Sequence, residues 1–165
     1  MNTEIFETMK ARSDEYIEKF NALADAGQNA LDTYGPYSAE CFAARELISD
    51  FRKKNEVLYN RGQCIAYRAY NNYKNGIYSV FVVDEDFYVT SDVKDFLDTV
   101  RKAEIETFIL TCKSTSLMEN IHDLVGYGCV LVEPCKVMKH SEYGNFERLG
   151  LMFRVNELEE TDHAE

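Results

Sequence analysis

The sequence lacks any apolar run that approaches the roughly 20 residues needed to cross a bilayer. It also lacks an apolar signal core near its start, where residues 1–10 carry Glu4 and Glu7, so we expect no export. No recognisable catalytic signature is present. These absences favour a cytoplasmic protein that is not an enzyme, carries no cofactor and does not interact with membranes.

Cysteine motifs are absent as well. The five cysteines are an odd number and form no CxxC pair, which argues against a disulfide framework or a zinc site. Unpaired cysteines in apolar stretches behave as small core residues. Five free thiols fit a reducing cytoplasm, and we expect no metal.

Basic residues are scarce: 18 Lys and Arg stand against 29 Asp and Glu, for a formal net charge of −11. Proteins that bind phosphate backbones are usually basic, so we expect no direct contact with nucleic acid. The excess is concentrated, because residues 84–98 hold six acidic residues against Lys94, and residues 156–165 hold five acidic residues and no Lys or Arg. We expect residues 156–165 to be an acidic flexible tail.

Apolar residues make up 45% of the 165 residues, and 11 Tyr and 10 Phe are among them. This content predicts a folded core of one-domain size. Apolar periodicity predicts helices over residues 3–34 and 39–60, the second capped by Ser38. The short loop between them indicates an antiparallel hairpin over residues 1–60. Steps of seven along the first helix suggest a seam that could pair two copies of the chain, at Met9, Tyr16, Leu23 and Ala30.

The rest of the chain, residues 63–155, predicts a sheet with helices. Residues 63–73 and 77–83 flank Asn75-Gly76, a strong signal for a β-hairpin turn. The same reading gives further strands over residues 87–89, 107–112, 129–138 and 146–155, and helices over 92–105 and 116–126. We therefore predict an α+β fold in one domain, residues 1–155, in which an N-terminal helical hairpin precedes a mixed sheet with two further helices packed on it.

Few individual residues are candidates for a catalytic or ligand-binding site. His122 and Asp123 are adjacent on a predicted helix, and we expect no hydrogen-bonded pair between them. Cys112 and Ser114 follow a predicted strand, where a ligand or an anion could bind beside Lys113. A capped loop between strand and helix explains the same residues.

The order of the predicted elements resembles that of the acetyl-CoA-dependent N-acetyltransferase superfamily. This resemblance implies a helix pair followed by a β-meander, and a Q/R-x-x-G-x-G/A turn that binds the cofactor pyrophosphate. The matching stretch, residues 87–95, has no glycine and carries Asp92 and Asp95, which would repel pyrophosphate. The resemblance implies, as an alternative function, a degenerate acetyltransferase-like enzyme or a small-ligand-binding domain.

The stretch Thr107-FILTCKSTSLMENIHDLVGYGC-Val130 resembles small proteins carried by phages and mobile elements of gut bacteria. The chain is acidic, its cysteines are expected to be reduced, and it has no enzyme motif. In these respects it is similar to inhibitors of the anti-CRISPR type. The resemblance implies a non-catalytic inhibitor that binds a host nucleic-acid-handling protein, namely a basic nuclease such as a CRISPR-Cas effector.

Two kinds of residue would make such a contact. Surface carboxylates could imitate the phosphates of nucleic acid, and tyrosines of the predicted meander suit a protein interface. A solvated acidic face and a half-buried sheet explain the same residues without a partner. A further alternative is a structural module that forms a homodimer through its N-terminal helices. The proposed partner-binding residues are Asp84, Glu85, Asp86, Asp92, Asp95, Asp98, Tyr70, Tyr73 and Tyr88.

Overall fold

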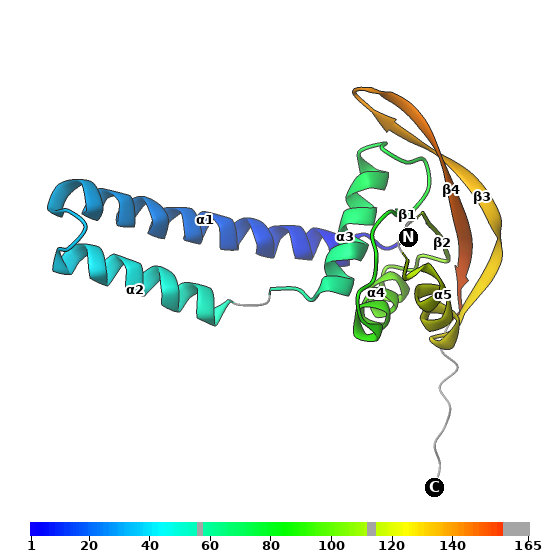
Figure 1. Cartoon of the computed structure of the whole chain (residues 1–165), viewed down its shortest axis with the longest axis horizontal. Helices are drawn as coiled ribbons and strands as arrows, with labels where there is room; N and C mark the ends of the chain where they lie inside the picture. The colour runs from blue at the N-terminus through cyan, green and yellow to red at the C-terminus, as the bar shows by residue number, and fades with distance from the viewer. Residues whose placement is uncertain (56–57, 112–114, 157–165) are drawn as a thin grey trace, which may run out of the picture. The chain divides into compact units, whose positions relative to one another are not determined.

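The fold is described here from a computed structural model, which describes residues 1–55, 58–111 and 115–156. The described elements confirm the predicted α+β class. They run in the order α1 (Glu4–Tyr34), α2 (Ala39–Lys54), α3 (Arg61–Lys74), β1 (Val82–Val83), α4 (Thr90–Lys102), β2 (Thr107–Leu110), α5 (Leu117–Gly126), β3 (Cys129–Ser141) and β4 (Gly144–Val155) (Figure 1).

The chain divides into two compact units. Unit 1 comprises Met1–Phe6 and Tyr59–Glu165, and unit 2 comprises Glu7–Leu58. The boundary near residue 58 falls where the predicted helical hairpin ends. That both units belong to one domain stays a prediction.

The sheet of unit 1 is mixed, with the strand order β1-β2-β4-β3. Strands β1 and β2 are parallel, while β4 is antiparallel to both β2 and β3. A parallel pair needs a crossover, and α4 supplies it between β1 and β2. Strand β3 lies at the edge of the sheet, and its register shifts between Leu131 and Glu133, next to Pro134, whose ring nitrogen cannot donate a hydrogen bond to a neighbouring strand.

Aromatic rings build the core between α4 and the sheet. Phe96 contacts Phe87 and Phe108 at centroid distances of 5.2 and 5.1 Å, and Phe108 stacks on Phe153 at 5.5 Å. A second buried cluster contains Tyr78, Val82, Ile109 and Val137. The sheet therefore buries apolar side chains on both of its faces over the short strands β1 and β2.

The predicted strand over residues 63–73 is wrong, because residues 61–74 form the helix α3. Asn60 and Gln63 make a capping box, in which Asn60 Oδ1 accepts from the Gln63 N–H and Gln63 Oε1 accepts from the Asn60 N–H. The buried side chains of Ile65 and Ala69 are four residues apart, as on one face of a helix. The helical spacing and the cap outweigh the aromatic content that favoured a strand.

The predicted hairpin turn at Asn75-Gly76 is also wrong. Asn75 is the C-cap of α3, and Gly76 follows it with a φ of +70°, so the glycine ends a helix. In the segment after it only Val82 and Val83 form a strand, and residues 87–89 form none. Unit 1 thus has three helices in its described part in place of the two predicted. Over residues 61–83, all of which are described, helix α3 and the two-residue strand β1 stand where the acetyltransferase resemblance implies a meander.

Unit 2 is an antiparallel pair of helices, as predicted. Tyr16 of α1 stacks on Phe51 of α2 at 5.1 Å, and the Arg52 guanidinium lies 5.1 Å from the Phe20 ring centroid. Ser38 caps α2 as predicted, because its Oγ accepts from the Cys41 N–H at 3.1 Å. Within the described ranges, no helix has the length and apolarity that a membrane span requires.

Candidate functional site

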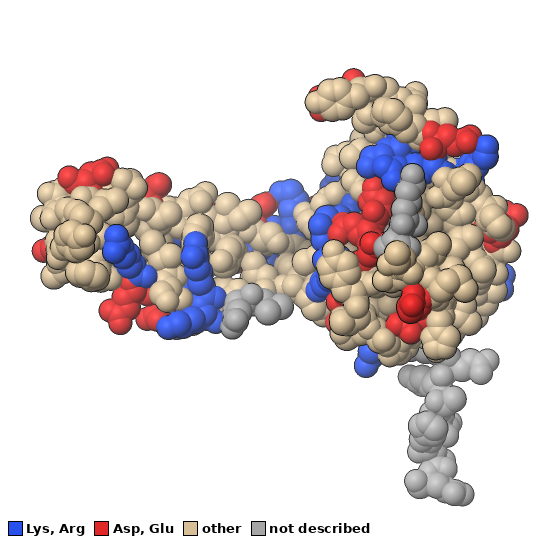
Figure 2. Space-filling model, in the orientation of Figure 1, with Lys and Arg blue, Asp and Glu red and all other residues tan. Residues whose placement is uncertain are grey.

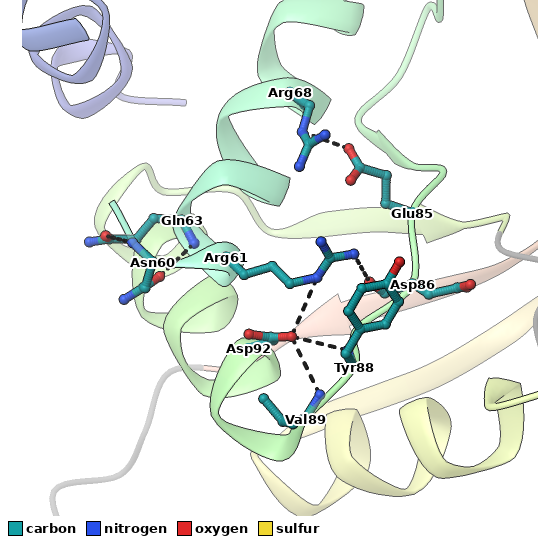
Figure 3. Close-up of polar contacts among 9 residues, drawn as sticks. All are labelled: Asn60, Arg61, Gln63, Arg68, Glu85, Asp86, Tyr88, Val89 and Asp92. Carbon is teal, nitrogen blue, oxygen red and sulfur yellow. Dashed lines mark hydrogen bonds and ion pairs between the residues drawn. The ribbon is translucent and has the colours of Figure 1, made fainter. Parts of the chain in front are cut away.

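The acidic segment of residues 84–98 leaves β1 and enters α4 around one arginine of α3 (Figure 3). Arg61 Nε lies 3.5 Å from Asp92 Oδ2, and Arg61 Nη2 donates to the Asp86 carbonyl oxygen at 2.9 Å. The same guanidinium lies 3.7 Å from the centroid of the Tyr88 ring, a cation–π contact. Arg61 therefore contacts three of the predicted contact residues, Asp86, Tyr88 and Asp92.

The Asp92 side chain caps the N-terminus of α4. Its Oδ2 accepts from the N–H groups of Tyr88 and Val89, at 3.0 and 3.4 Å, and the residue is 7% exposed. A carboxylate at this end of a helix satisfies free N–H groups and interacts favourably with the helix dipole. Its burial removes Asp92 from any surface array that imitates phosphates.

Asp84 and Glu85 face basic side chains of unit 1. Asp84 Oδ2 accepts from Lys139 Nζ at 3.2 Å and from the Tyr78 hydroxyl at 3.1 Å. Arg68 Nε lies 2.8 Å from Glu85 Oε1. Burial raises the pKa of Glu85, and burial together with the Asp84 charge raises the pKa of Tyr78 to about 12. On the face shown in Figure 2, acidic and basic side chains of unit 1 lie next to one another.

The remaining predicted contact residues divide between surface and core. Asp95 and Asp98 are half-buried, and Asp98 lies 3.8 Å from Arg101. Tyr73 and Tyr88 are 40% and 73% exposed. Tyr70 is buried and stacks on Phe6 at 4.4 Å, so Tyr70 and Asp92 do not belong to an accessible contact surface.

A polar cavity of about 350 Å³ lies beside this cluster. Asp84 and Thr111, which directly follow the parallel strands β1 and β2, both line it, at the kind of place where α/β sheets bind ligands. Asp86 Oδ1 is buried without a hydrogen bond within the described part of the chain. The remaining lining residues are Arg61, Glu85, Asp86, Tyr88 and Arg148.

The predicted site at Cys112, Lys113 and Ser114 lies outside the described residues.

The expectation that His122 and Asp123 do not pair is wrong. Their Nδ1 and Oδ1 atoms lie 3.3 Å apart, because both side chains bend toward each other at the surface of α5. The His122 side chain is 87% exposed, so this contact is a surface hydrogen bond rather than a buried catalytic dyad. Among the described residues, no cluster of three His, Cys, Asp or Glu has the geometry to hold a metal.

The sequence analysis missed an apolar surface on the β3–β4 hairpin. Strand β2 ends at Leu110, opposite Leu151, so the part of β4 from Gly144 to Gly150 pairs with β3 alone. The two exposed apolar residues of this part of β4, Phe146 and Leu149, are three positions apart, so they lie on opposite faces of the hairpin. In the sequence, the signal for this surface is that the strand predicted over residues 146–155 is longer than the one predicted over 107–112. We call the exposed apolar residues of the two strands and their turn the hairpin surface; they are Val130, Leu131, Val132, Met138, Tyr143, Phe146 and Leu149.

Comparison with known proteins assigns the chain to a family but indicates no activity. A family model described as "Domain of unknown function (DUF7698)" matches residues 65–149. The matched segment lies within unit 1 and includes α3 from Ile65 onward, the acidic segment and most of the β3–β4 hairpin. Neither the search of curated proteins nor the search of solved structures gave a match.

Proposed function

Because the chain belongs to the DUF7698 family, a domain of unknown function, we propose its function from the geometry of its own residues. It is a non-catalytic inhibitor of the anti-CRISPR type, which binds a basic nucleic-acid-handling protein such as a CRISPR effector by protein–protein contact. The observation that carries the proposal is the hairpin surface on a chain of net charge −11.

The hairpin surface has the composition of a protein interface. Tyr143 is 85% exposed, Leu149 71% and Phe146 51%. Leu149 shares one face of the hairpin with Met138, and Phe146 lies on the opposite face. Exposed large apolar side chains are candidates for interaction sites, and aromatic anchors dominate the binding free energy of many interfaces. Lys136 and Glu147 form an ion pair at 2.8 Å between Met138 and Leu149 on one face of the hairpin, which gives the apolar residues a polar surround.

The acidic charge then has a role in selecting the partner. A net negative chain is steered toward a basic partner and repelled by the nucleic acid that this partner binds. Asp84, Glu85 and Asp92 are already paired inside unit 1. In our proposal, nucleic-acid mimicry is therefore limited to the half-buried charges of Asp95 and Asp98, and the hairpin surface supplies most of the affinity.

The test is a DNA-cleavage assay with purified type II and type V CRISPR nucleases loaded with guide RNA. Excess wild-type protein is expected to block cleavage by one of them. Leu149→Asp, which leaves the sheet core intact, should weaken inhibition by about tenfold or more because it charges the interface. Asp95→Asn with Asp98→Asn should weaken it only at low salt, by about threefold.

Two results contradict the proposal. If none of the nucleases is inhibited, the inhibitor function is wrong. If inhibition survives Leu149→Asp unchanged, the hairpin surface is not the contact. Val125→Asp on α5 is the matched control, because Val125 is 50% exposed and lies outside the hairpin.

The cavity beside Arg61 favours a second candidate, a small-ligand-binding domain. Arg148 lines it, and the buried Asp86 Oδ1 adds an unused acceptor nearby. A rise in melting temperature with acetyl-CoA would favour this alternative, and no shift at millimolar concentration would count against it.

We also propose a cytoplasmic location. Cys41, Cys64, Cys129 and Cys135 are free thiols, and burial raises the pKa of Cys129 to about 11. Unpaired buried thiols are typical of reducing compartments.

A further inference from the structure

Unit 2 leaves apolar side chains outside its helix pair. Met9 and Cys41 are its buried hydrophobic residues within the described part, whereas Ile17, Phe42 and Leu47 are 53%, 54% and 58% exposed. Of the predicted seam of Met9, Tyr16, Leu23 and Ala30, Tyr16 packs against Phe51 of the same chain. We therefore look for a pairing surface on another face of the helix pair.

A stripe on α2 has the pattern that such a pairing requires. Glu40, Leu47 and Lys54 follow one another at steps of seven, so they share one face of the helix. All three are exposed, and neither Glu40 nor Lys54 forms an ion pair within the described residues. The stripe therefore runs from negative to apolar to positive over about 21 Å.

This order is self-complementary in one orientation only. When two copies of α2 pack antiparallel about a two-fold axis at Leu47, the two leucines meet, Glu40 faces Lys54 of the partner subunit, and Lys54 faces Glu40 of the partner subunit. A parallel arrangement would oppose like charges at both ends. The stripe thus distinguishes the two orientations without any other contact.

The charge of the whole unit favours the same orientation. Tyr16 and Phe20 of α1 lie beside Phe51 of α2, and the stretches 7–20 and 51–58 of unit 2 carry six basic and five acidic side chains. The other half, residues 21–50, carries five acidic side chains and one arginine, Arg45. An antiparallel second copy places each acidic half against the half that carries most of the basic side chains of unit 2.

We propose that unit 2 is a homodimerisation element, in which the Glu40–Leu47–Lys54 stripes of two chains pack antiparallel and the two hairpins form a four-helix bundle. The occupant of this face is a second copy of the chain. The proposal is independent of the proposed inhibitor function, because it uses unit 2 and the inhibitor contact uses the β3–β4 hairpin.

The first test is the mass of the full chain by light scattering. The expected mass is twice the chain mass of 19.1 kDa. Leu47→Glu should give a monomer, since it places two carboxylates at the two-fold axis. Phe42→Glu is the matched control, because Phe42 is about equally exposed but lies about 140° away around α2. It should leave the dimer intact, with helix content checked by circular dichroism for both variants.

The second test exchanges the charges. Glu40→Lys alone, or Lys54→Glu alone, should weaken the dimer by about tenfold, because each opposes like charges twice. The double variant Glu40→Lys with Lys54→Glu restores opposite pairs and should bind to within about threefold of the wild type. High salt should reduce the differences among these variants.

The outcomes are decisive either way. A wild-type chain that is monomeric at about 100 µM overturns the proposal, as does a dimer that survives Leu47→Glu. A double variant no better than the single variants overturns the antiparallel register. Failure here is distinguishable from failure of the inhibitor proposal, because Leu149→Asp should remain dimeric and monomeric Leu47→Glu should retain the hairpin surface.

Discussion

The two units of this chain bury apolar side chains to very different extents. Unit 1 contains 23 of the 25 buried hydrophobic residues in the described part of the chain, and unit 2 contains Met9 and Cys41. Both units hold aromatic side chains, so the difference does not come from composition. Tyr16, Phe20 and Phe51 of unit 2 remain only partly buried, whereas Phe96, Phe108 and Phe153 of unit 1 are inaccessible to solvent or nearly so.

The difference follows from the number of layers. A mixed sheet with helices against it covers a side chain on several sides, while two helices share a single seam and leave their other faces in water. In unit 2 the stripe of α2 is exposed and has no covering element within the unit, which is why we assign the homodimer contact there.

The largest expected contrast comes from truncating one aromatic ring in each unit. Phe153→Ala should lower the free energy of unfolding by about 3–5 kcal/mol, because Phe153 is fully buried against Phe108. Phe51→Ala should cost about 1–2 kcal/mol, since the lost side chain was already partly exposed to water. Hydrogen exchange measured by mass spectrometry reports each unit separately. Equal losses of protection would contradict the difference in burial.

A smaller effect is expected where α3 crosses α4. A Cβ on Gly62 would overlap the Asp92 carbonyl oxygen and lie 2.6 Å from the Phe96 nitrogen, so the two helices would have to move apart. Gly62→Ala should therefore destabilise unit 1 by about 3 kcal/mol in urea unfolding. Gly126→Ala in α5 is the control: nothing lies near the added methyl, and alanine favours a helix. A neutral Gly62→Ala would show that α3 is not tightly packed on α4.

The same region shows how far the sequence could predict the fold. Elements with one clear period were found, since the apolar spacing of α4 and the short apolar run of β2 are unambiguous. Helix α3 was missed because its tyrosines favour strands and Asn75-Gly76 favours a hairpin turn. The deciding signals, the Asn60–Gln63 capping box and the close approach at Gly62, depend on geometry that composition alone does not show.

The candidate site was predicted less well than the fold. The acidic segment was found because charge is visible in the sequence, but its partners are not. Arg61 and Arg68 come from α3, and Lys139 comes from β3, all distant in sequence from residues 84–92. The hairpin surface was missed because its exposure depends on where β2 stops beside β4. Pairing between distant segments decides both whether a carboxylate is free and whether an apolar strand is covered.

The smallest expected effect is a loss of stability at alkaline pH that is specific to unit 1. Tyr78 is buried in unit 1 beside Asp84, and its pKa is raised from 10.0 to about 12. Below pH 10 the phenol is protonated in the folded and the unfolded chain, so its contribution to stability is complete. As pH rises from 10 to 12 the unfolded chain loses this proton first, and that contribution is progressively lost. Unit 1 should therefore lose hydrogen-exchange protection in this window.

Tyr78→Phe isolates the contribution of this one phenol from other alkaline titrations. The variant should be less stable near neutral pH, because Asp84 loses a hydrogen bond, but its stability should fall less steeply between pH 10 and 12. Phenolate absorbance during the same titration should show one late tyrosine in the wild type that the variant lacks. Identical alkaline slopes for the two proteins would mean that Tyr78 is accessible to water, and the buried cluster around it would then be looser than the core at Phe153.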